Sequence, residues 1–241
     1  MKKYVSILLT AVMAASLSAC GGSDADTLQT EESVITTEVT ETSTQGGEIE
    51  SQTQESDGGK VLVAYFSYAE NADLPDNAEA STSASIDMWN GKTTGNTGVV
   101  ADMIANAAGG ELHSILTAEK YPGNYDDTLD QAQNEGRENA RPELVSSIEN
   151  FDEYDTVFIG FPNWWGDMPM ALYSFFDEYD FSGKTIIPFC TSGGSGFSDA
   201  INTIKELEPG ANVIEDGLSV SASGASGAES EVNEWLNGLE Y

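Results

Sequence analysis

The chain has 241 residues and a formal net charge of −32, with 41 acidic residues against 9 basic ones. This imbalance argues against nucleic acid as a partner, because neutralising phosphates requires Lys and Arg. It also argues against docking on an anionic lipid surface. The acidity either serves only to keep the protein in solution or steers basic partner proteins toward it.

The N-terminus has the three parts of a secretory signal. Lys2 and Lys3 supply positive charge, residues 4–17 form an uncharged apolar run, and small residues precede Cys20. About 14 residues are too few to span a hydrocarbon layer roughly 30 Å thick as a permanent helix. The sequence Leu-Ser-Ala-Cys that ends at Cys20 resembles the bacterial lipobox. This resemblance implies removal of residues 1–19 and lipidation of Cys20, whereas the alternative is an ordinary secretory signal with a chance cysteine.

The segment after Cys20 is rich in Ser, Thr, Glu and Gln and contains no Lys, Arg or aromatic residue up to position 59. Such a segment buries too little apolar surface to offset its ordering entropy, so we expect residues 20–59 to form a disordered, lipidated tether. The protein should therefore be exported and held at the outer side of a membrane. Residues 60–241 are enough for one domain with a sizeable core.

Apolar runs typical of buried parallel strands alternate with helical patterns through this domain. Strands are expected at 60–67, 111–116, 155–161, 184–190 and 212–216, the last with an optional extension to 220. Helices are expected at 97–108, 125–139, 170–179, 198–207 and 228–237. This alternation predicts an α/β fold of three layers, α/β/α, around a five-stranded parallel sheet. Five β/α units fit the strand order 2-1-3-4-5.

Ligands of such sheets bind outside the carboxyl ends of the strands, at the switch point between strands 1 and 3. After the first strand come Ser67 and, further along, the residues that open a helix: Thr93, Thr94, Gly95, Asn96 and Thr97. Hydroxyl groups, free backbone N–H groups and the helix dipole can bind an anion there without Lys or Arg. The alternative is an ordinary helix cap.

The loops after strands 3 and 4 are also unusual in composition. After strand 3 the sequence reads Pro162, Asn163, Trp164, Trp165 and Gly166. The adjacent tryptophans either stack on a flat aromatic ligand or cover the domain's own core. After strand 4 it reads Thr191, Ser192, Gly193, Gly194, Ser195 and Gly196. These glycines either let the backbone approach a ligand closely or form a flexible turn. Because all three loops fall at one edge of the sheet, together they indicate a ligand site.

These loops resemble those of flavodoxins and NAD(P)H:quinone-reductase-like flavoproteins, over about residues 60–239. Val-Ala-Tyr-Phe-Ser and Thr-Gly-Asn-Thr are similar to the family's FMN-phosphate loop, and the other two loops to those that flank the isoalloxazine. The resemblance implies a flavodoxin-like fold and FMN as a non-covalent cofactor. It implies that the phosphate is held by Ser67, Thr94, Asn96 and Thr97, with Gly95 admitting it. It also implies that Trp164 and Trp165 lie by the ring, Asn163 and Gly166 near flavin N5, and residues 192–196 at the pyrimidine edge.

The phosphate loop departs from the compact family pattern Ser-x-Thr-Gly-Asn-Thr. Ser67 and Thr94 are 27 positions apart, so about 25 residues, approximately 69–92, are inserted. The insertion either loops out and leaves the phosphate site intact, forms a lid or a docking surface for a partner, or is a surface excursion without a role.

The resemblance favours an FMN-dependent electron carrier, and the negative charge is compatible with a basic redox partner protein that is reached by electrostatic steering. No dedicated nicotinamide motif is visible, which favours the carrier over an NAD(P)H-dependent quinone-type oxidoreductase. A non-redox lipoprotein that captures a flat solute is the third alternative. No catalytic residue or metal ligand is assigned, because the sole His113 suits a structural role. Cys190 alone can form neither an intrachain disulfide nor a cysteine metal cluster once Cys20 is lipidated.

Overall fold

The computed structural model describes residues 59–75 and 85–239. The expected signal peptide, Cys20 and nearly all of the tether lie outside these residues, as does the middle of the insertion, 76–84. Within the described ranges, no helix has the length and apolar character needed to cross a membrane.

The domain is built on a parallel sheet with the order β4-β1-β5-β6-β7, in which β8 also pairs with β6. The strands are β1 (Lys60–Tyr65), β4 (Glu111–Ser114), β5 (Tyr154–Pro162), β6 (Thr185–Ser192), β7 (Asn212–Val213) and β8 (Leu218–Ser221). In the register, Leu62 of β1 lies opposite Glu111 on one side and Val157 on the other. The α/β class and the predicted 2-1-3-4-5 order are therefore confirmed, with the switch point between β1 and β5.

The predicted fifth strand is in fact divided into β7 and β8, so the sheet has six strands rather than five. Ile214 donates its N–H to the carbonyl oxygen of Ile186 in β6 at 2.9 Å. Pro188 lies two residues after Ile186 in β6, and as a proline it has no N–H to donate to a neighbouring strand. The chain leaves β6 at this point and pairs with it again where Leu218 lies opposite Phe189. The prediction of a single continuous strand was wrong, because Pro188 in the neighbouring strand interrupts the pairing.

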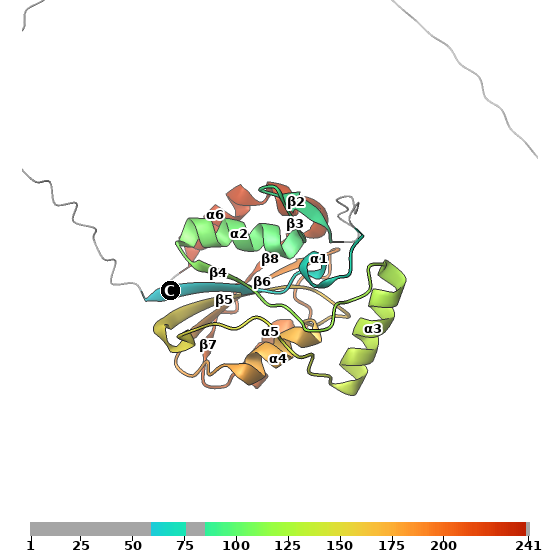
Figure 1. Ribbon diagram of the computed structural model, residues 1–241. Helices are drawn as coiled ribbons and strands as arrows, with labels where there is room; N and C mark the ends of the chain where they lie inside the picture. Colours follow the sequence, from blue (N-terminus) through green and yellow to red (C-terminus); the bar gives the residue numbers. More distant parts are fainter. Residues whose placement is uncertain (1–58, 76–84, 240–241) are drawn as a thin grey trace, which may run out of the picture. The chain divides into compact units, whose positions relative to one another are not determined.

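Helices cover both faces of the sheet (Figure 1). Helices α2 (Asn96–Ala108) and α6 (Glu229–Gly238) pack on one face, and α4 (Met170–Glu178) and α5 (Ala200–Leu207) on the other. On the first face, Val100 and Ile104 of α2 are fully buried against Val63. Burying each such side chain contributes about 1.5–3 kcal/mol. The three-layer prediction is thus confirmed.

The remaining elements surround this framework. Helix α3 (Tyr125–Glu138) stands at the edge of the sheet where β1 and β5 end (Figure 1). Two short 3-10 turns, η1 (Phe151–Glu153) and η2 (Ala222–Gly227), precede β5 and α6. Apart from the divided fifth strand, the predicted strands and helices begin and end within two residues of the observed ones.

The described parts of the insertion form elements that the sequence did not predict. They are the short helix α1 (Tyr68–Asn71) and an antiparallel hairpin of β2 (Asp87–Trp89) and β3 (Lys92–Thr94). The indole N–H of Trp89 donates to Asp102 of α2 at 2.8 Å. The buried amide of Asn71 donates to the carbonyl oxygens of Ser67 and Ile115, both at 3.0 Å. Both described ends of the insertion are therefore fixed to the domain.

Candidate functional site

A cavity of about 550 Å³ opens where β5 and β6 end. Predicted site residues in its lining come from the second and third loops: Pro162, Asn163, Trp164, Trp165, Gly166, Thr191, Ser192, Gly193 and Ser195. The volume lies within the range of small-molecule and cofactor pockets. The structure therefore brings these two loops together around one space, as their place in the sheet predicts.

A tight turn sets the shape of the second loop. The N–H of Trp164 donates to the carbonyl oxygen of Asp167 at 2.8 Å, and the reverse bond measures 3.0 Å. The two residues between them, Trp165 and Gly166, have φ of 57° and 85°, as in a type I′ turn. Positive φ is ordinary for glycine and unfavourable for a bulky L-residue. The turn therefore holds Trp165 at its tip, 59% exposed, at a cost in backbone strain.

The two tryptophans have different surroundings. The ring of Trp164 packs edge-on against Phe66 and Tyr121, with centroid distances of 5.4 and 5.3 Å. Trp164 therefore covers the domain's own core while one part of it faces the cavity. Trp165 lies outside this aromatic cluster, so it is the ring that remains available to stack on a ligand.

Side-chain hydrogen bonds join the second and third loops into one wall. The amide of Asn163 donates to the carbonyl oxygen of Gly196 at 2.7 Å. In the third loop, the hydroxyl oxygen of Ser192 accepts the N–H groups of Gly194 and Gly196 at 3.2 and 3.0 Å. These two N–H groups are thus directed at Ser192, whereas Gly193 lines the cavity.

The first loop meets the other two at the start of α2. Gly95 is the N-cap of this 13-residue helix, and no side chain within the described ranges caps it. Backbone N–H groups of a first helical turn have no partner within the helix. The hydroxyl oxygens of Thr97 and Thr191 lie 2.8 Å apart, which places this helix start directly beside the third loop. The arrangement can hold an anion next to the cavity.

Ser67 lies beside Gly95 even though the insertion separates them in sequence. A Cβ on Gly95 would collide with the hydroxyl oxygen of Ser67 and come within 2.5 Å of the carbonyl oxygen of Ser85. The Ser67 hydroxyl is buried and has no hydrogen-bond partner among the residues that the structure describes. A buried polar group left in this way costs about 1–3 kcal/mol. The split loop therefore comes together in space and presents an unsatisfied hydroxyl beside a glycine.

Thr93 and Thr94 lie differently from the other predicted phosphate residues. Thr93 is exposed on β3, and its hydroxyl contacts the sulfur of Met88 at 3.3 Å. Thr94 is buried, and its hydroxyl donates to the carboxylate of Glu70. Neither hydroxyl lines the cavity. Phosphate binding by these two side chains stays a prediction, and in this conformation only their backbone is near the helix start.

Glu70 is the centre of a hydroxyl cluster that sequence reasoning did not identify. Its carboxylate accepts hydrogen bonds from Tyr65 at 2.9 and 3.0 Å, and from Thr94 and Ser114. Burial raises the pKa of the Tyr65 hydroxyl, and the charge of Glu70 raises it further, so Tyr65 remains a donor. Glu70 thus connects both ends of the insertion to β1 and β4.

Helix α3 supplies a wall of the cavity that the sequence analysis also missed. Its contribution consists of Tyr125, Thr128, Leu129 and Ala132. These residues have the spacing i, i+3, i+4, i+7 of one helix face, so the pattern could have revealed them. Tyr68 of α1, Ser85 of the insertion and Ala222 complete the lining.

The cavity is electrically neutral in an acidic domain. None of the described residues that line it carries a formal charge. Within the described ranges, no cluster of three or more His, Cys, Asp or Glu side chains could hold a metal ion. An anionic group would therefore be held by hydroxyls, backbone N–H groups and the α2 dipole rather than by cations.

Comparison with known proteins agrees with this architecture. The family model described as Flavodoxin matches residues 88–239. A candidate flavoprotein from Bacteroides uniformis is 32% identical, with a TM-score of 0.58, covering 75% of this chain and 99% of that one. A candidate flavoprotein from Bacteroides eggerthii is 27% identical, with a TM-score of 0.54, covering 75% and 97%. A flavoprotein from Lactobacillus acidophilus, solved in complex with FMN, is 21% identical, with a TM-score of 0.52, covering 74% and 99%. No curated protein matches.

Proposed function

Because the chain belongs to the flavodoxin family, we propose that its domain binds one FMN non-covalently and passes electrons to a partner protein. The observation that carries this proposal is the neutral, aromatic-lined cavity of about 550 Å³ at the switch point of the sheet, beside the start of α2. FMN combines a flat ring system with a phosphate dianion, and the two parts of the site suit these two groups. Bound FMN supplies the redox chemistry, while the protein binds it and adjusts its potential.

The residues of the phosphate side fit this cofactor. The buried hydroxyl of Ser67 lacks a partner among the described residues, and the absent side chain of Gly95 leaves space beside it. We assign phosphate binding to Ser67, to the backbone N–H groups at Asn96 and Thr97, and to the hydroxyl of Thr97. Helix N-termini bind phosphate in this way without basic side chains.

The residues of the ring side suit an isoalloxazine. Trp165 projects from a strained turn, and strain of this kind persists where surrounding structure maintains it for a function. We assign stacking to Trp165, polar contacts to the turn after Asn163, and contacts with the pyrimidine edge to Gly193 and Ser195. The turn's ties to the third loop keep these groups in place before the cofactor binds.

The acidity of the domain is expected to lower the potential at which bound FMN takes up its second electron. From residue 59 onward the chain has 31 Asp and Glu against 7 Lys and Arg. Negative charge and apolar cover both disfavour a further negative charge on the flavin. Spectroelectrochemistry measures this couple, and a potential no lower than that of free FMN contradicts the expectation.

Three alternatives are separated by two simple measurements. If the protein binds FMN and its flavin is inert when mixed with NADH or NADPH in a stopped-flow instrument, the protein is a carrier. Rapid reduction of the flavin instead identifies an NAD(P)H-dependent oxidoreductase of quinones or similar acceptors. A protein that is colourless as purified and refuses added FMN supports the non-redox solute-binding lipoprotein and refutes the other two functions.

We also propose that the domain is tethered outside the cytoplasm by a lipid on Cys20, and that its redox partner presents a basic docking face. The lipobox-like sequence supports the first proposal, and the net charge supports the second. Mass spectrometry of the mature N-terminus tests lipidation, which Cys20→Ser should abolish. Electron transfer to a basic partner should slow steeply as salt increases, and a salt-independent rate contradicts electrostatic docking.

A further inference from the structure

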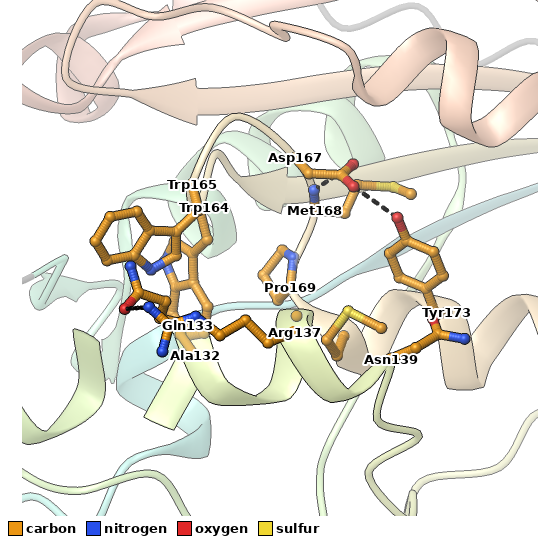
Figure 2. Close-up of a pocket in the computed structure, with 12 residues that line it drawn as sticks. Ala132, Gln133, Arg137, Asn139, Trp164, Trp165, Asp167, Met168, Pro169 and Tyr173 are labelled. Carbon is orange, nitrogen blue, oxygen red and sulfur yellow. Dashed lines mark hydrogen bonds between the residues drawn. The ribbon is translucent and has the colours of Figure 1, made fainter. Parts of the chain in front are cut away.

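A second groove, of about 360 Å³, adjoins the proposed flavin cavity. The two share Ala132, Trp164 and Trp165, and the groove otherwise lies between α3 and the start of α4. Figure 2 shows Trp165 and Gln133 at one end of the groove and Tyr173 with Asp167 at the other. Its volume suits a molecule of one or two rings.

The groove contains a cation without an acidic partner. Arg137 hydrogen-bonds to the amide oxygens of Asn134, at 3.3 Å, and Gln133. Within the described ranges, no carboxylate lies at ion-pair distance from Arg137, whereas Lys60, Arg141 and Lys205 all form such pairs. A guanidinium has five N–H donors, so the bonds to the two amides leave donors for a ligand. An arginine left in this state can pair with an incoming anion.

The carboxylate in the same groove does not compete for Arg137. Asp167 accepts the Tyr173 hydroxyl at 2.6 Å on one oxygen and the N–H of Met168 at 2.8 Å on the other. Both bonds are drawn in Figure 2. Burial, followed by this contact with Asp167, raises the pKa of Tyr173, so its hydroxyl remains a donor. The charge of Asp167 is thus engaged at the end of the groove away from Gln133, to which Arg137 is bonded.

The groove also has an exposed aromatic side chain in its wall. Trp165 is 59% exposed and has a φ of 57°, so a strained turn presents a large apolar ring at the surface. Pro169 and Met168 add apolar surface. A flat ring on Trp165 together with an anionic substituent on Arg137 would use both features, since an aromatic face and a guanidinium each recognise one half of such a molecule.

Trp165 lines both the flavin cavity and this groove. We propose that the groove is a binding site for a small planar aromatic carboxylate, which stacks on the part of Trp165 that borders the groove and is held by the guanidinium of Arg137. Its position next to the flavin rests on the proposed FMN function and would make the ligand a neighbour of the cofactor. The groove itself is defined without FMN, so binding can be measured independently.

Isothermal titration with 2-naphthoate, on the purified chain before and after saturation with FMN, tests the site. We expect one 2-naphthoate per chain in both states, with the neutral analogue 2-naphthamide at least about tenfold weaker. Arg137→Gln should weaken 2-naphthoate binding roughly ten- to a hundredfold, the range of a charge-assisted hydrogen bond, and Arg137→Lys should weaken it less. Lys205→Gln is the control, because it also removes one positive charge, from a lysine that is paired with Glu215. It should change the affinity for 2-naphthoate less than about twofold.

Equal affinities of the Arg137→Gln and Lys205→Gln variants overturn the proposal, and so does displacement of 2-naphthoate by FMN, which would make the groove part of the flavin site. Failure of FMN to bind, with Arg137-dependent binding of 2-naphthoate intact, refutes the proposed function and leaves this site standing.

Discussion

Replacing Glu70 by glutamine tests whether the insertion is fixed to the domain through one carboxylate. Hydroxyls of Tyr65, Thr94 and Ser114 all donate to this group, and a hydrogen bond to a charged partner contributes about 1.5–3 kcal/mol. Glutamine keeps one acceptor oxygen and replaces the other by an amide donor. We therefore expect the free energy of unfolding to fall by about 1.5–3 kcal/mol, which lowers Tm by roughly 3–12 °C in a domain of this size.

Thermal unfolding followed by circular dichroism measures this effect, with Glu206→Gln as the control. Glu206 is exposed on α5, so its substitution removes the same charge without touching the hydroxyl cluster. FMN affinity of Glu70→Gln should also fall, because Thr94 precedes the helix start proposed to hold the phosphate. If Glu70→Gln and Glu206→Gln change Tm equally, the insertion is not held by Glu70.

Three further predictions concern the site and the stability of the domain. Thr97→Val removes the hydroxyl bond to Thr191 and a proposed phosphate donor, so the Kd for FMN should rise about three- to tenfold in a fluorescence titration; an unchanged Kd removes Thr97 from the site. Trp165→Gly relieves the positive φ, so it should raise Tm slightly while weakening FMN binding, and tighter FMN binding would contradict stacking. Burial, with Asp180 and Asp177 nearby, raises the pKa of Glu208 from 4.5 to about 7. The folded protein therefore favours the protonated carboxyl, and the stability that Glu208 contributes is present at low pH and lost as the pH rises from about 4.5 through 7. Glu208→Gln should therefore raise Tm by roughly 1–4 °C at pH 8 and leave it unchanged at pH 5, and an equal effect at both pH values refutes this origin.

The sequence predicted those features of the fold that depend on local pattern. Buried apolar runs alternating with amphipathic stretches were enough for the strands, the covering helices and the order of the sheet. The division of the fifth strand was not predictable from its own residues, because Pro188 of β6 interrupts the pairing. The hairpin of the insertion was missed because its strands have three residues each and no apolar alternation.

The candidate site was predictable to the extent that its residues are adjacent in sequence. Composition singled out the loops around Trp165 and Gly193, and topology placed them at one edge. The sequence did not show that Trp164 packs on Phe66 and Tyr121 while Trp165 lies outside this cluster, because these contacts join distant segments of the chain. The role of Glu70 was hidden for the same reason, since its partners belong to separate elements.

FMN binding by the chain is tested most simply by titrating the purified protein with FMN and measuring the quenching of flavin fluorescence, with Gly95→Ala measured in parallel. We expect one FMN per chain. We also expect an affinity for FMN at least tenfold weaker in Gly95→Ala, because the added Cβ would collide with Ser67 and approach the Ser85 carbonyl oxygen within 2.5 Å. Gly136→Ala, whose Cβ meets nothing within 4 Å, should bind FMN like the unmodified chain. No binding of FMN by the unmodified chain would refute the proposed cofactor, and equal binding by Gly95→Ala would refute the phosphate site at Ser67 and Gly95.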